Sequence, residues 1–231
     1  MTSRGFFDEH PRFLGTSATG ASRKRLNGRY RGLVARQAEV LRGARVLDIA
    51  SHDGRWSLAA IRAGAARVTG IEVREPLVGR AVAAMAEYGV SADRYEFLLG
   101  DAHEVLTRLR PGQFETILCL GFLYHTARHL ALLSAMSRLR PRHLIVDTDV
   151  APDDDPVIRL GLESTDDEGH SAGDGAAAMV GVPSRAALEL MLRHVGYGSI
   201  GYVDWHGFTE DWDQLSDYRD GRRVSLRAGP T

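Results

Sequence analysis

The chain has 231 residues, of which 44% are hydrophobic and 26% are charged. This composition is typical of one globular α/β domain with insertions and excludes a largely disordered chain. The sequence contains no run of about 18 apolar residues that could span a bilayer, and its first ten residues lack the apolar stretch of a secretory signal. Its sole cysteine, Cys119, cannot form an internal disulfide. We therefore expect a cytoplasmic protein with no membrane partner.

The formal net charge of −1 hides two segments of opposite sign. Residues 1–45 hold ten Arg or Lys against three Asp or Glu, a net charge of +7, whereas residues 147–220 hold seventeen acids against four Arg, a net charge of −13. The basic segment could bind a phosphate or the acidic segment of the same or another subunit. The sequence leaves these alternatives open, including nucleic-acid binding and a homodimer.

Apolar runs that predict strands alternate with helical patterns through the first two thirds of the chain. A basic amphipathic helix is predicted over 22–41. Five buried strands are predicted at 45–50, 67–73, 95–99, 115–120 and 143–150, separated by helices at 54–64, 76–88, 102–109 and 128–139. Strands this apolar need cover on both faces, which indicates a parallel sheet with helices on each side and right-handed crossovers.

The last third of the chain departs from this alternation. Residues 151–182 are rich in Asp, Gly and Ala and are predicted to form a long irregular insert, followed by a helix from Pro183 to Gly196. Strands at 199–205 and 222–228 are predicted to pair antiparallel at the sheet edge. We therefore predict a Rossmann-like, doubly wound α/β fold whose seven-stranded sheet is mostly parallel with an antiparallel terminal strand. It comprises an amino-terminal arm and helix (1–44) and one domain (45–231).

The turn after the first strand reads Asp48-Ile49-Ala50-Ser51-His52-Asp53-Gly54. Ligands of open parallel sheets bind beside this turn, at the carboxyl ends of the strands. A dinucleotide fingerprint would need glycines where this chain has Ala50, His52 and Arg55, and Asp53 would repel a phosphate. The turn favours a cofactor with an adenosine end and no phosphate, such as S-adenosylmethionine.

The segment VLDIASHDGRWS resembles the first motif of class I S-adenosylmethionine-dependent methyltransferases. Three further strand ends resemble that family in order: Glu72, then Gly100-Asp101-Ala102, then the run LGFLYH from Leu120 to His125. The chain departs from the family in the turn, where D-x-G-x-G-x-G reads D-I-A-S-H-D-G and keeps only Gly54. The resemblance implies the methyltransferase fold and S-adenosylmethionine as the cofactor.

The resemblance also implies a role for each strand-end residue. Asp48 would bind the ammonium of the cofactor, the Gly54 amide its carboxylate, Glu72 both ribose hydroxyls and Asp101 the adenine amino group. The remaining predicted cofactor-binding residues are Ala50, Ser51, Val73, Ala102 and Leu120. Structural alternatives stay open: a helix cap for Asp53, a salt bridge with Arg74 for Glu72 and a helix cap for Asp101.

Methyl transfer to a hydroxyl needs a base near the fourth or fifth strand end. His125 is the predicted catalytic residue, because it directly follows the fourth strand and because imidazole titrates near neutral pH. The alternative is that His125 packs under the turn with Tyr124. His129 could share a face with His125, and His52 could orient the first turn.

Asp147 and Asp149 end the fifth predicted strand and are the candidate ligands of a Mg²⁺ ion, which could lower the pKa of an acceptor hydroxyl. A solvated acidic loop is the alternative. The insert 151–182, with acids that include Glu163, is predicted to be a lid that shapes the acceptor pocket. Four side chains beyond it could stack on a sugar or a base or belong to the core: Trp205, His206, Phe208 and Trp212.

The acceptor is predicted from charge and resemblance. The run GFLYH is also similar to a segment of the transferases that modify wobble uridine in tRNA, but a region of net charge −13 would repel an RNA backbone. Lys24 is the sole lysine, an Arg-dominated composition typical of GC-rich bacteria. By similarity to actinobacterial sugar O-methyltransferases, we predict methylation of a hydroxyl on a small molecule, most plausibly a saccharide. A tRNA-modifying transferase and a non-catalytic cofactor-binding protein are the alternatives.

Overall fold

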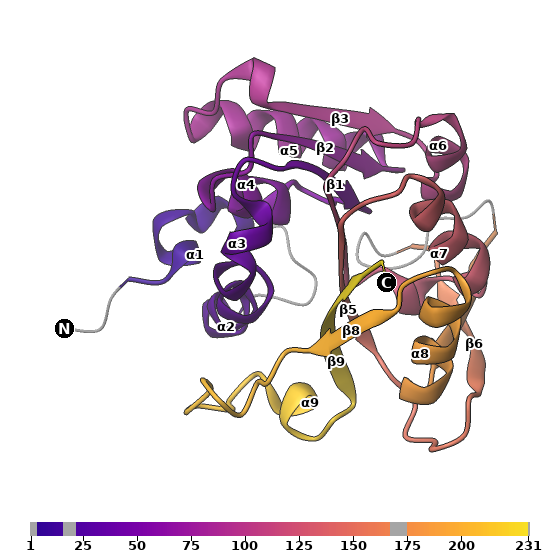
Figure 1. Cartoon of the computed structure of the whole chain (residues 1–231). Helices are drawn as coiled ribbons and strands as arrows, with labels where there is room; N and C mark the ends of the chain where they lie inside the picture. The colour runs from indigo at the N-terminus through magenta and orange to yellow at the C-terminus, as the bar shows by residue number, and fades with distance from the viewer. Residues whose placement is uncertain (1–3, 16–21, 167–174, 231) are drawn as a thin grey trace.

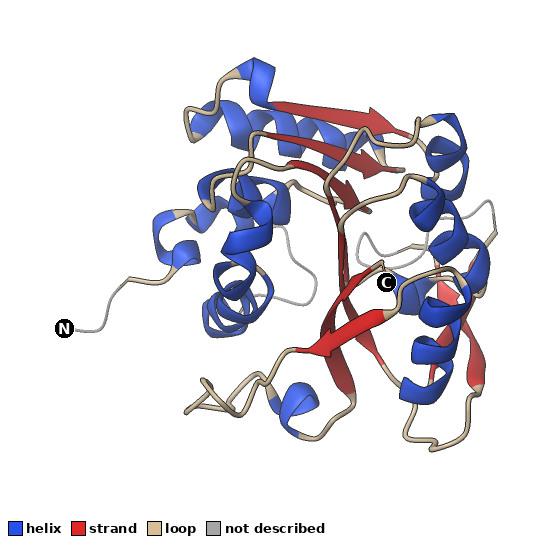
Figure 2. Ribbon diagram, viewed as in Figure 1, coloured by secondary structure: helices blue, strands red, loops and turns tan. Residues whose placement is uncertain are grey.

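A seven-stranded sheet between two layers of helices forms the centre of the protein (Figures 1 and 2). The computed structural model describes residues 4–15, 22–166 and 175–230. The strands of this sheet are β1 (Arg45–Ile49), β2 (Arg67–Glu72), β3 (Tyr95–Leu99), β4 (Thr116–Leu120), β5 (His143–Asp149), β8 (Ser199–Tyr202) and β9 (Arg223–Gly229). Their spatial order is β3-β2-β1-β4-β5-β9-β8.

The sheet is parallel from β3 to β5, and β9 runs antiparallel to both of its neighbours, β5 and β8. This confirms the predicted mostly parallel sheet and the antiparallel pairing of the last two strands. Of these last two strands only β8 lies at an edge of the sheet, because β9 inserts between β5 and β8. The carboxyl ends of β1, β2, β3, β4 and β5 therefore meet along one side of the sheet, where ligands of such folds bind.

The helices divide between the two faces. The α-helices are α1 (Phe6–Glu9), α2 (Arg23–Leu33), α3 (Ala38–Leu41), α4 (Arg55–Arg62), α5 (Glu75–Glu87), α6 (Ala102–Arg108), α7 (His129–Arg138), α8 (Arg185–His194) and α9 (Ser216–Arg219). The 3₁₀ helices are η1 (Pro11–Leu14), η2 (Ala35–Gln37), η3 (Ala92–Arg94) and η4 (Leu123–His125). The amino-terminal helices lie on the side of α4 and α5, and α6, α7 and α8 lie on the other (Figure 1). None of the helices within the described ranges has both the length and the apolar character that crossing a bilayer requires.

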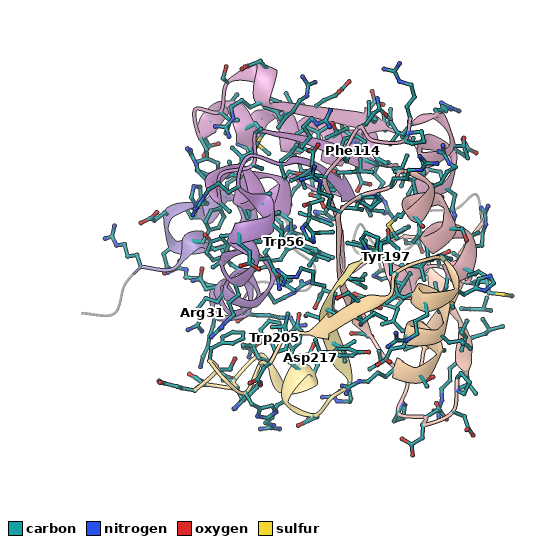
Figure 3. The ribbon with its side chains drawn as sticks, viewed as in Figure 1. Arg31, Trp56, Phe114, Tyr197, Trp205 and Asp217 are labelled. Carbon is teal, nitrogen blue, oxygen red and sulfur yellow. The ribbon has the colours of Figure 1, made fainter. Side chains whose placement is uncertain are left out.

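Two hydrophobic clusters fill the space on either side of the sheet. Val46 belongs to the cluster under the amino-terminal helices, and its neighbour Leu47 belongs to the cluster under α7 and α8. This alternation is the two-residue period of a strand covered on both faces. Figure 3 shows Trp56 and Trp205 on the side of the amino-terminal helices and Tyr197 on the opposite side.

The predicted helix over 22–41 is broken into α2, η2 and α3. Ser22 caps α2 by accepting a hydrogen bond from the backbone N–H of Arg25, and α2 ends where Val34 leaves the helical conformation, with φ −122° and ψ −58°. A straight helix of this length would extend about 30 Å. The break at Val34 instead lets Leu26, Leu33 and Leu41 all enter the core beside the sheet.

The expectation of an irregular insert at 151–182 is wrong for most of its described residues. β6 (Ile158–Ser164) and β7 (Ala177–Pro183) pair antiparallel and form a separate two-stranded sheet, here called the β6–β7 hairpin. Residues 167–174 of the predicted lid lie outside the described residues. The acidic and glycine-rich composition of the whole insert masked the alternating apolar residues Ile158, Leu160 and Leu162 that mark β6.

The two oppositely charged segments meet within one chain. Lys24 on α2 lies 2.5 Å from Asp211 and 3.1 Å from Asp213, and Arg25 lies 2.7 Å from Asp217. Asp217, labelled in Figure 3, lies in the first turn of the short helix α9, whose Tyr218 stacks on Trp205. Of the alternatives that the sequence left open, the structure thus favours intramolecular pairing for these basic residues of α2.

Candidate functional site

The turn after β1 has left-handed backbone at every second residue. Ala50 and His52 both have φ of +53°, and Gly54 has φ of +79°. These are the three positions at which the methyltransferase motif has glycine, the residue that adopts this conformation at no steric cost. The turn therefore keeps the conformation that the motif favours although two glycines are replaced, at a cost of about 1 to 2 kcal/mol for each substituted position.

Asp48 lies at the end of β1 with only 1% of its surface exposed. The Ser57 hydroxyl donates a hydrogen bond of 2.6 Å to Asp48 Oδ2. Burial, together with the charges of Glu72 and Asp53, raises the pKa of Asp48 to about 7, against the opposing effect of Ser57. A cation placed here would favour the ionised carboxylate, as the predicted contact with an ammonium requires. Ser57 was not singled out from the sequence, although it lies within the motif segment.

Glu72, at the end of β2, joins the two turns that flank it. Its Oε2 accepts a hydrogen bond from the backbone N–H of His52, and its Oε1 accepts one from the backbone N–H of Arg74, both at 2.9 Å. The contact of Glu72 with Arg74, whose salt bridge was the structural alternative, includes the main chain of that residue. Each carboxylate oxygen can accept two hydrogen bonds. Glu72 is therefore held in place and retains the capacity to accept from two ribose hydroxyls.

Asp101 follows β3 and caps α6. Its Oδ1 accepts hydrogen bonds from the backbone N–H groups of His103 and Glu104, at 2.8 and 3.2 Å. The structural alternative for Asp101 is therefore present. The cap uses one carboxylate oxygen, so that Oδ2 is compatible with the predicted contact to an adenine amino group.

Apolar side chains are exposed where an adenine ring is expected. Val73 follows β2 and is 39% exposed, and Leu99, at the end of β3, is 53% exposed. Leu99 pairs with Glu72 in the sheet register. Ala102 and Leu120, the other predicted apolar contacts, are mostly buried. Leu99 was missed from the sequence, where it read as one of several leucines in an apolar strand.

Two predicted cofactor contacts do not fit their positions. The Gly54 N–H donates to the backbone oxygen of Ser51 at 2.9 Å, so that it is already used within the turn and is not directed to a ligand carboxylate. The Ser51 side chain is fully buried against Gly70, and its N–H donates to the backbone oxygen of Ile71. Both residues shape the turn. A Cβ on Gly54 would come within 3.0 Å of Ala81, so that packing also requires glycine here.

Asp53 forms a buried ion pair with Arg55. Arg55 Nε and Nη2 lie 2.7 and 2.8 Å from the two oxygens of Asp53, and Arg55 Nη2 lies 3.0 Å from His52 Nδ1. Burial alone would raise the pKa of Asp53, but Arg55 and His52 hold it well below its usual range. His52 thus has the loop-orienting contacts that the sequence suggested.

His125 ends η4, directly after β4, and contacts the β6–β7 hairpin. Its Nδ1 lies 2.7 Å from Oε2 of Glu163 on β6, and the two side chains are only 11% and 17% exposed. The His125 ring also packs against Tyr124, with the ring centroids 4.1 Å apart. The sequence identified both residues of this contact but did not connect them, because 38 residues separate them.

His129 contacts the other strand of the same hairpin. Its Nε2 lies 2.8 Å from the backbone oxygen of Gly181 on β7, and the ring is 1% exposed. Burial lowers the pKa of His129, so that the ring is neutral and donates its Nε2 proton to this carbonyl. His125 and His129 therefore hold the β6–β7 hairpin at two points beside the end of β4.

Asp147 does not fit a metal site. Its Oδ2 accepts hydrogen bonds from Arg29 at 2.7 Å and from Arg223 at 2.6 Å, and its Oδ1 accepts from Tyr218 and Ser225. Burial alone would raise the pKa of Asp147, but the two guanidinium groups hold it well below its usual range. Both oxygens are thus engaged, and two cations already face the carboxylate.

Asp149 gives no support to the metal interpretation either. Its Oδ1 lies 2.8 Å from Nη1 of Arg223. Within the described ranges, no group of three or more His, Cys, Asp or Glu side chains is arranged to hold a metal ion. The sequence did not reveal Arg29 or Arg223 as partners of these acids, although Arg223 within an apolar strand was a signal.

The aromatic residues proposed for acceptor stacking lie against the amino-terminal helices. Trp205 is 4% exposed, stacks on Tyr218 with the ring centroids 3.9 Å apart, and donates to Ser225. Phe208 packs under the guanidinium of Arg36. Trp205 therefore belongs to the core, which was the structural alternative.

Comparison with known proteins identifies a methyltransferase domain within the chain. Residues 46–142 match the family model described as a methyltransferase domain. A tRNA U34 carboxymethyltransferase of Idiomarina loihiensis is 26% identical over 199 residues, which cover 83% of this chain and 57% of that protein. A ubiquinone biosynthesis O-methyltransferase of Dechloromonas aromatica is 33% identical over 103 residues, 45% of this chain and 42% of that protein. The chain thus spans about half the length of these curated relatives.

A solved structure extends the similarity to the whole fold. The N-terminal domain of EvdMO1, crystallised in the presence of SAH and D-fucose, superposes with a TM-score of 0.67 at 20% identity, over 92% of this chain and 85% of that chain. The matched family segment contains Asp48, Glu72, Asp101 and His125, which stand at four successive strand ends. The match identifies residues 46–142 as a methyltransferase domain, and the superposition shows that the fold around it is shared over 92% of the chain.

Proposed function

We propose that the protein transfers a methyl group from S-adenosylmethionine to a hydroxyl of a small molecule, with a saccharide as the acceptor class and His125 as the base. The observation that carries this proposal is the position of His125. It follows β4 at the sheet edge that holds Asp48 and Glu72, and it faces a carboxylate of the β6–β7 hairpin.

The residues at the strand ends fit such a donor. Asp48, Glu72 and Asp101 are acceptors for an ammonium, two hydroxyls and an amino group, and exposed Val73 and Leu99 offer apolar contact to a purine ring. The edge carries several carboxylates, which disfavour a phosphate and favour a donor that bears positive charge. When bound, the donor supplies a methyl group on a positively charged sulfur.

The chain's residues would orient the reactants and accept one proton. The acceptor hydroxyl oxygen forms a bond to the methyl carbon as the carbon–sulfur bond breaks, and that bond's electron pair stays on sulfur. The hydroxyl proton moves to the imidazole of His125. Such proton removal contributes about 10²- to 10⁴-fold to the rate.

Three observations support a small hydroxylated acceptor. A curated relative of part of the chain is an O-methyltransferase, and a protein of similar fold was crystallised with D-fucose. In addition, Lys24, Arg25 and Arg29 of the basic helix α2 are paired with acids of the same chain, which reduces the positive surface that an RNA backbone would need.

A tRNA acceptor is the second candidate. It is favoured by the 26% identity to a tRNA U34 carboxymethyltransferase, which extends over 83% of this chain. A screen distinguishes the saccharide acceptor from the tRNA acceptor. The release of S-adenosylhomocysteine (SAH) is measured with saccharides, small phenols and unmodified tRNA, each with Mg²⁺ and with chelator. We expect turnover with a saccharide and the same rate in chelator. Turnover with tRNA alone would contradict the saccharide proposal.

Two variants test the assigned roles. Glu72→Gln, measured by calorimetry with S-adenosylhomocysteine, should weaken binding about 10-fold or more, because a charged acceptor for two hydroxyls is lost. Glu96→Gln is the matched control, since Glu96 is an exposed acid on β3 that pairs with Arg67. His125→Ala should keep this affinity and lose turnover. Retained turnover in His125→Ala would exclude His125 as the base, and a chain that binds the donor without any turnover would be a binding protein.

A further inference from the structure

The β6–β7 hairpin brings a carboxylate to the predicted base from outside the central sheet. Glu163 on β6 pairs with Ala178 on β7 in the hairpin register. Its Oε2 lies 2.7 Å from Nδ1 of His125, and both side chains are mostly buried. A hydrogen bond to a partly desolvated carboxylate is stronger than one on the surface, and its geometry is better defined.

An ionised carboxylate has no proton to donate, so it can take part in a hydrogen bond only as the acceptor. The 2.7 Å contact therefore requires a proton on Nδ1 of His125, since an unprotonated Nδ1 would set two lone pairs against each other. In the neutral ring that proton leaves the lone pair on Nε2. The ionised carboxylate also stabilises the positive charge that the ring gains when Nε2 takes up a second proton.

We propose that Glu163 is a positioning residue that holds the His125 imidazole with its proton on Nδ1 and so makes Nε2 the nitrogen that accepts the proton of the acceptor hydroxyl. This inference rests on the proposed function. The acceptor proton moves to Nε2, the Nδ1 proton stays on the ring, and Glu163 remains ionised throughout. The β6–β7 hairpin is thereby part of the catalytic arrangement.

His129 provides an internal reference for this assignment. Its contact to the backbone oxygen of Gly181 requires a proton on Nε2, the opposite tautomer to that of His125. Both histidines contact the same hairpin and lie four residues apart in the chain. Glu163 contacts His125 on β6, whereas the partner of His129 is a main-chain carbonyl on β7, so that removal of the Glu163 carboxylate should affect only one of the two rings.

The first test is a long-range ¹H–¹⁵N correlation spectrum of the full chain with ¹⁵N-labelled histidine, recorded above pH 7 without any acceptor. The His125 signals are identified by their loss in His125→Gln. We expect His125 with its proton on Nδ1 and His129 with its proton on Nε2. In Glu163→Ala, His125 should shift toward the Nε2-protonated tautomer while the His129 signals stay in place. A wild-type His125 protonated on Nε2, or an unchanged tautomer in Glu163→Ala, would overturn the proposal.

The second test asks whether turnover needs the charge of Glu163 or only its hydrogen bond to His125. Glu163→Gln keeps the side-chain volume and a carbonyl that can accept from Nδ1, but it lacks the charge. With the acceptor that the screen identifies, kcat should fall about 10-fold or more in this variant while the affinity for S-adenosylhomocysteine is unchanged. Asp153→Asn is the matched control, because Asp153 pairs with Arg159 of the same hairpin and not with His125. A wild-type kcat in Glu163→Gln would show that Glu163 only holds the hairpin against His125, and it would contradict the proposal.

The two tests also distinguish this proposal from the proposed function. The spectrum needs no acceptor, so that it reports on the Glu163–His125 contact whatever reaction the protein performs. If the tautomers are as expected and His125→Ala keeps turnover, the positioning by Glu163 stands and the role of His125 as base fails. If the tautomers are not as expected and His125→Ala loses turnover, the role of His125 stands and the role of Glu163 fails.

Discussion

Arg223 on β9 and Asp147 on β5 lie 2.6 Å apart, and both side chains are buried. Arg29 of α2 donates to the same carboxylate oxygen at 2.7 Å. The carboxylate thus links the parallel strand β5, the antiparallel strand β9 and the amino-terminal helix α2. A Cβ on Gly121, after β4, would lie 3.2 Å from Arg223 and 3.5 Å from Arg29, so that this network lies directly beside the strand end that leads to His125.

Removing one partner of this network should destabilise the fold strongly. Arg29→Met is expected to lower the free energy of unfolding by about 3 to 5 kcal/mol, because it leaves a buried carboxylate with fewer compensating charges. Chemical denaturation measures this change. Arg67→Met is the control, since its pair with Glu96 is exposed and should contribute less than about 1 kcal/mol. Equal losses in the two variants would contradict the structural importance of the buried network.

Asp48 should make stability depend on pH. In the folded chain Asp48 keeps its proton up to about pH 7, whereas in the unfolded chain it loses the proton near the ordinary value of 3.8. The folded state binds more protons in this window, so that this group lowers the free energy of unfolding as pH rises from about 4 to 7.

Asp48→Asn tests this linkage. The variant should be more stable than the wild type by about 1 to 3 kcal/mol at pH 8, nearly equal to it at pH 4, and weaker in binding S-adenosylhomocysteine. Denaturation at the two pH values and calorimetry measure these effects. Glu96→Gln, which changes an exposed acid, should show no such difference. A loss of stability at pH 8 in Asp48→Asn would show that the carboxylate is ionised and well stabilised without a ligand.

The left-handed conformation of Ala50 should make glycine favourable there. Ala50→Gly removes a Cβ from a residue with φ of +53° and should raise the free energy of unfolding by about 0.5 to 1 kcal/mol. Ala83→Gly, on the exposed side of α5, is the control with the opposite sign, since glycine in a helix costs about 1 kcal/mol. Thermal denaturation compares the two variants. Destabilisation by both would indicate that the turn has a different backbone.

Cys119 should be unreactive in the folded protein. It is fully buried on β4, and burial, together with the charges of Asp48 and Asp147, raises the pKa of its thiol to about 12. Thiolate is the reactive form, so that a thiol reagent should label the native chain slowly even at pH 9. Because Cys119 is the sole cysteine, the total signal reports on this site alone. Rapid labelling without denaturant would contradict its burial.

The local pattern of the sequence was sufficient to predict the central sheet. The apolar runs at β1, β2, β4 and β5 are mostly buried, whereas β3, expected to be buried too, lies at an edge of the sheet and is partly exposed. Parallel strands necessarily bring their carboxyl ends to one side of the sheet. Asp48, Glu72 and Asp101 could therefore be grouped by their positions at strand ends together with the resemblance to the methyltransferase motifs. The same pattern reading failed for the insert, because the alternation in β6 is short and is surrounded by acidic and glycine residues.

The sequence by itself determined which segments form the parallel strands and which carboxylates stand at their ends along the chain. Both depend on the periodicity of neighbouring residues. Only the tertiary structure decided what each carboxylate contacts. From the sequence, Asp147 is a candidate metal ligand, but in the structure Arg29, 118 residues away, occupies its carboxylate. Glu163 is one of many acids in the insert, and only the structure shows that it contacts His125. The reason is physical: the charge and role of a buried carboxyl depend on the groups within a few ångströms, and folding brings those groups from distant parts of the chain.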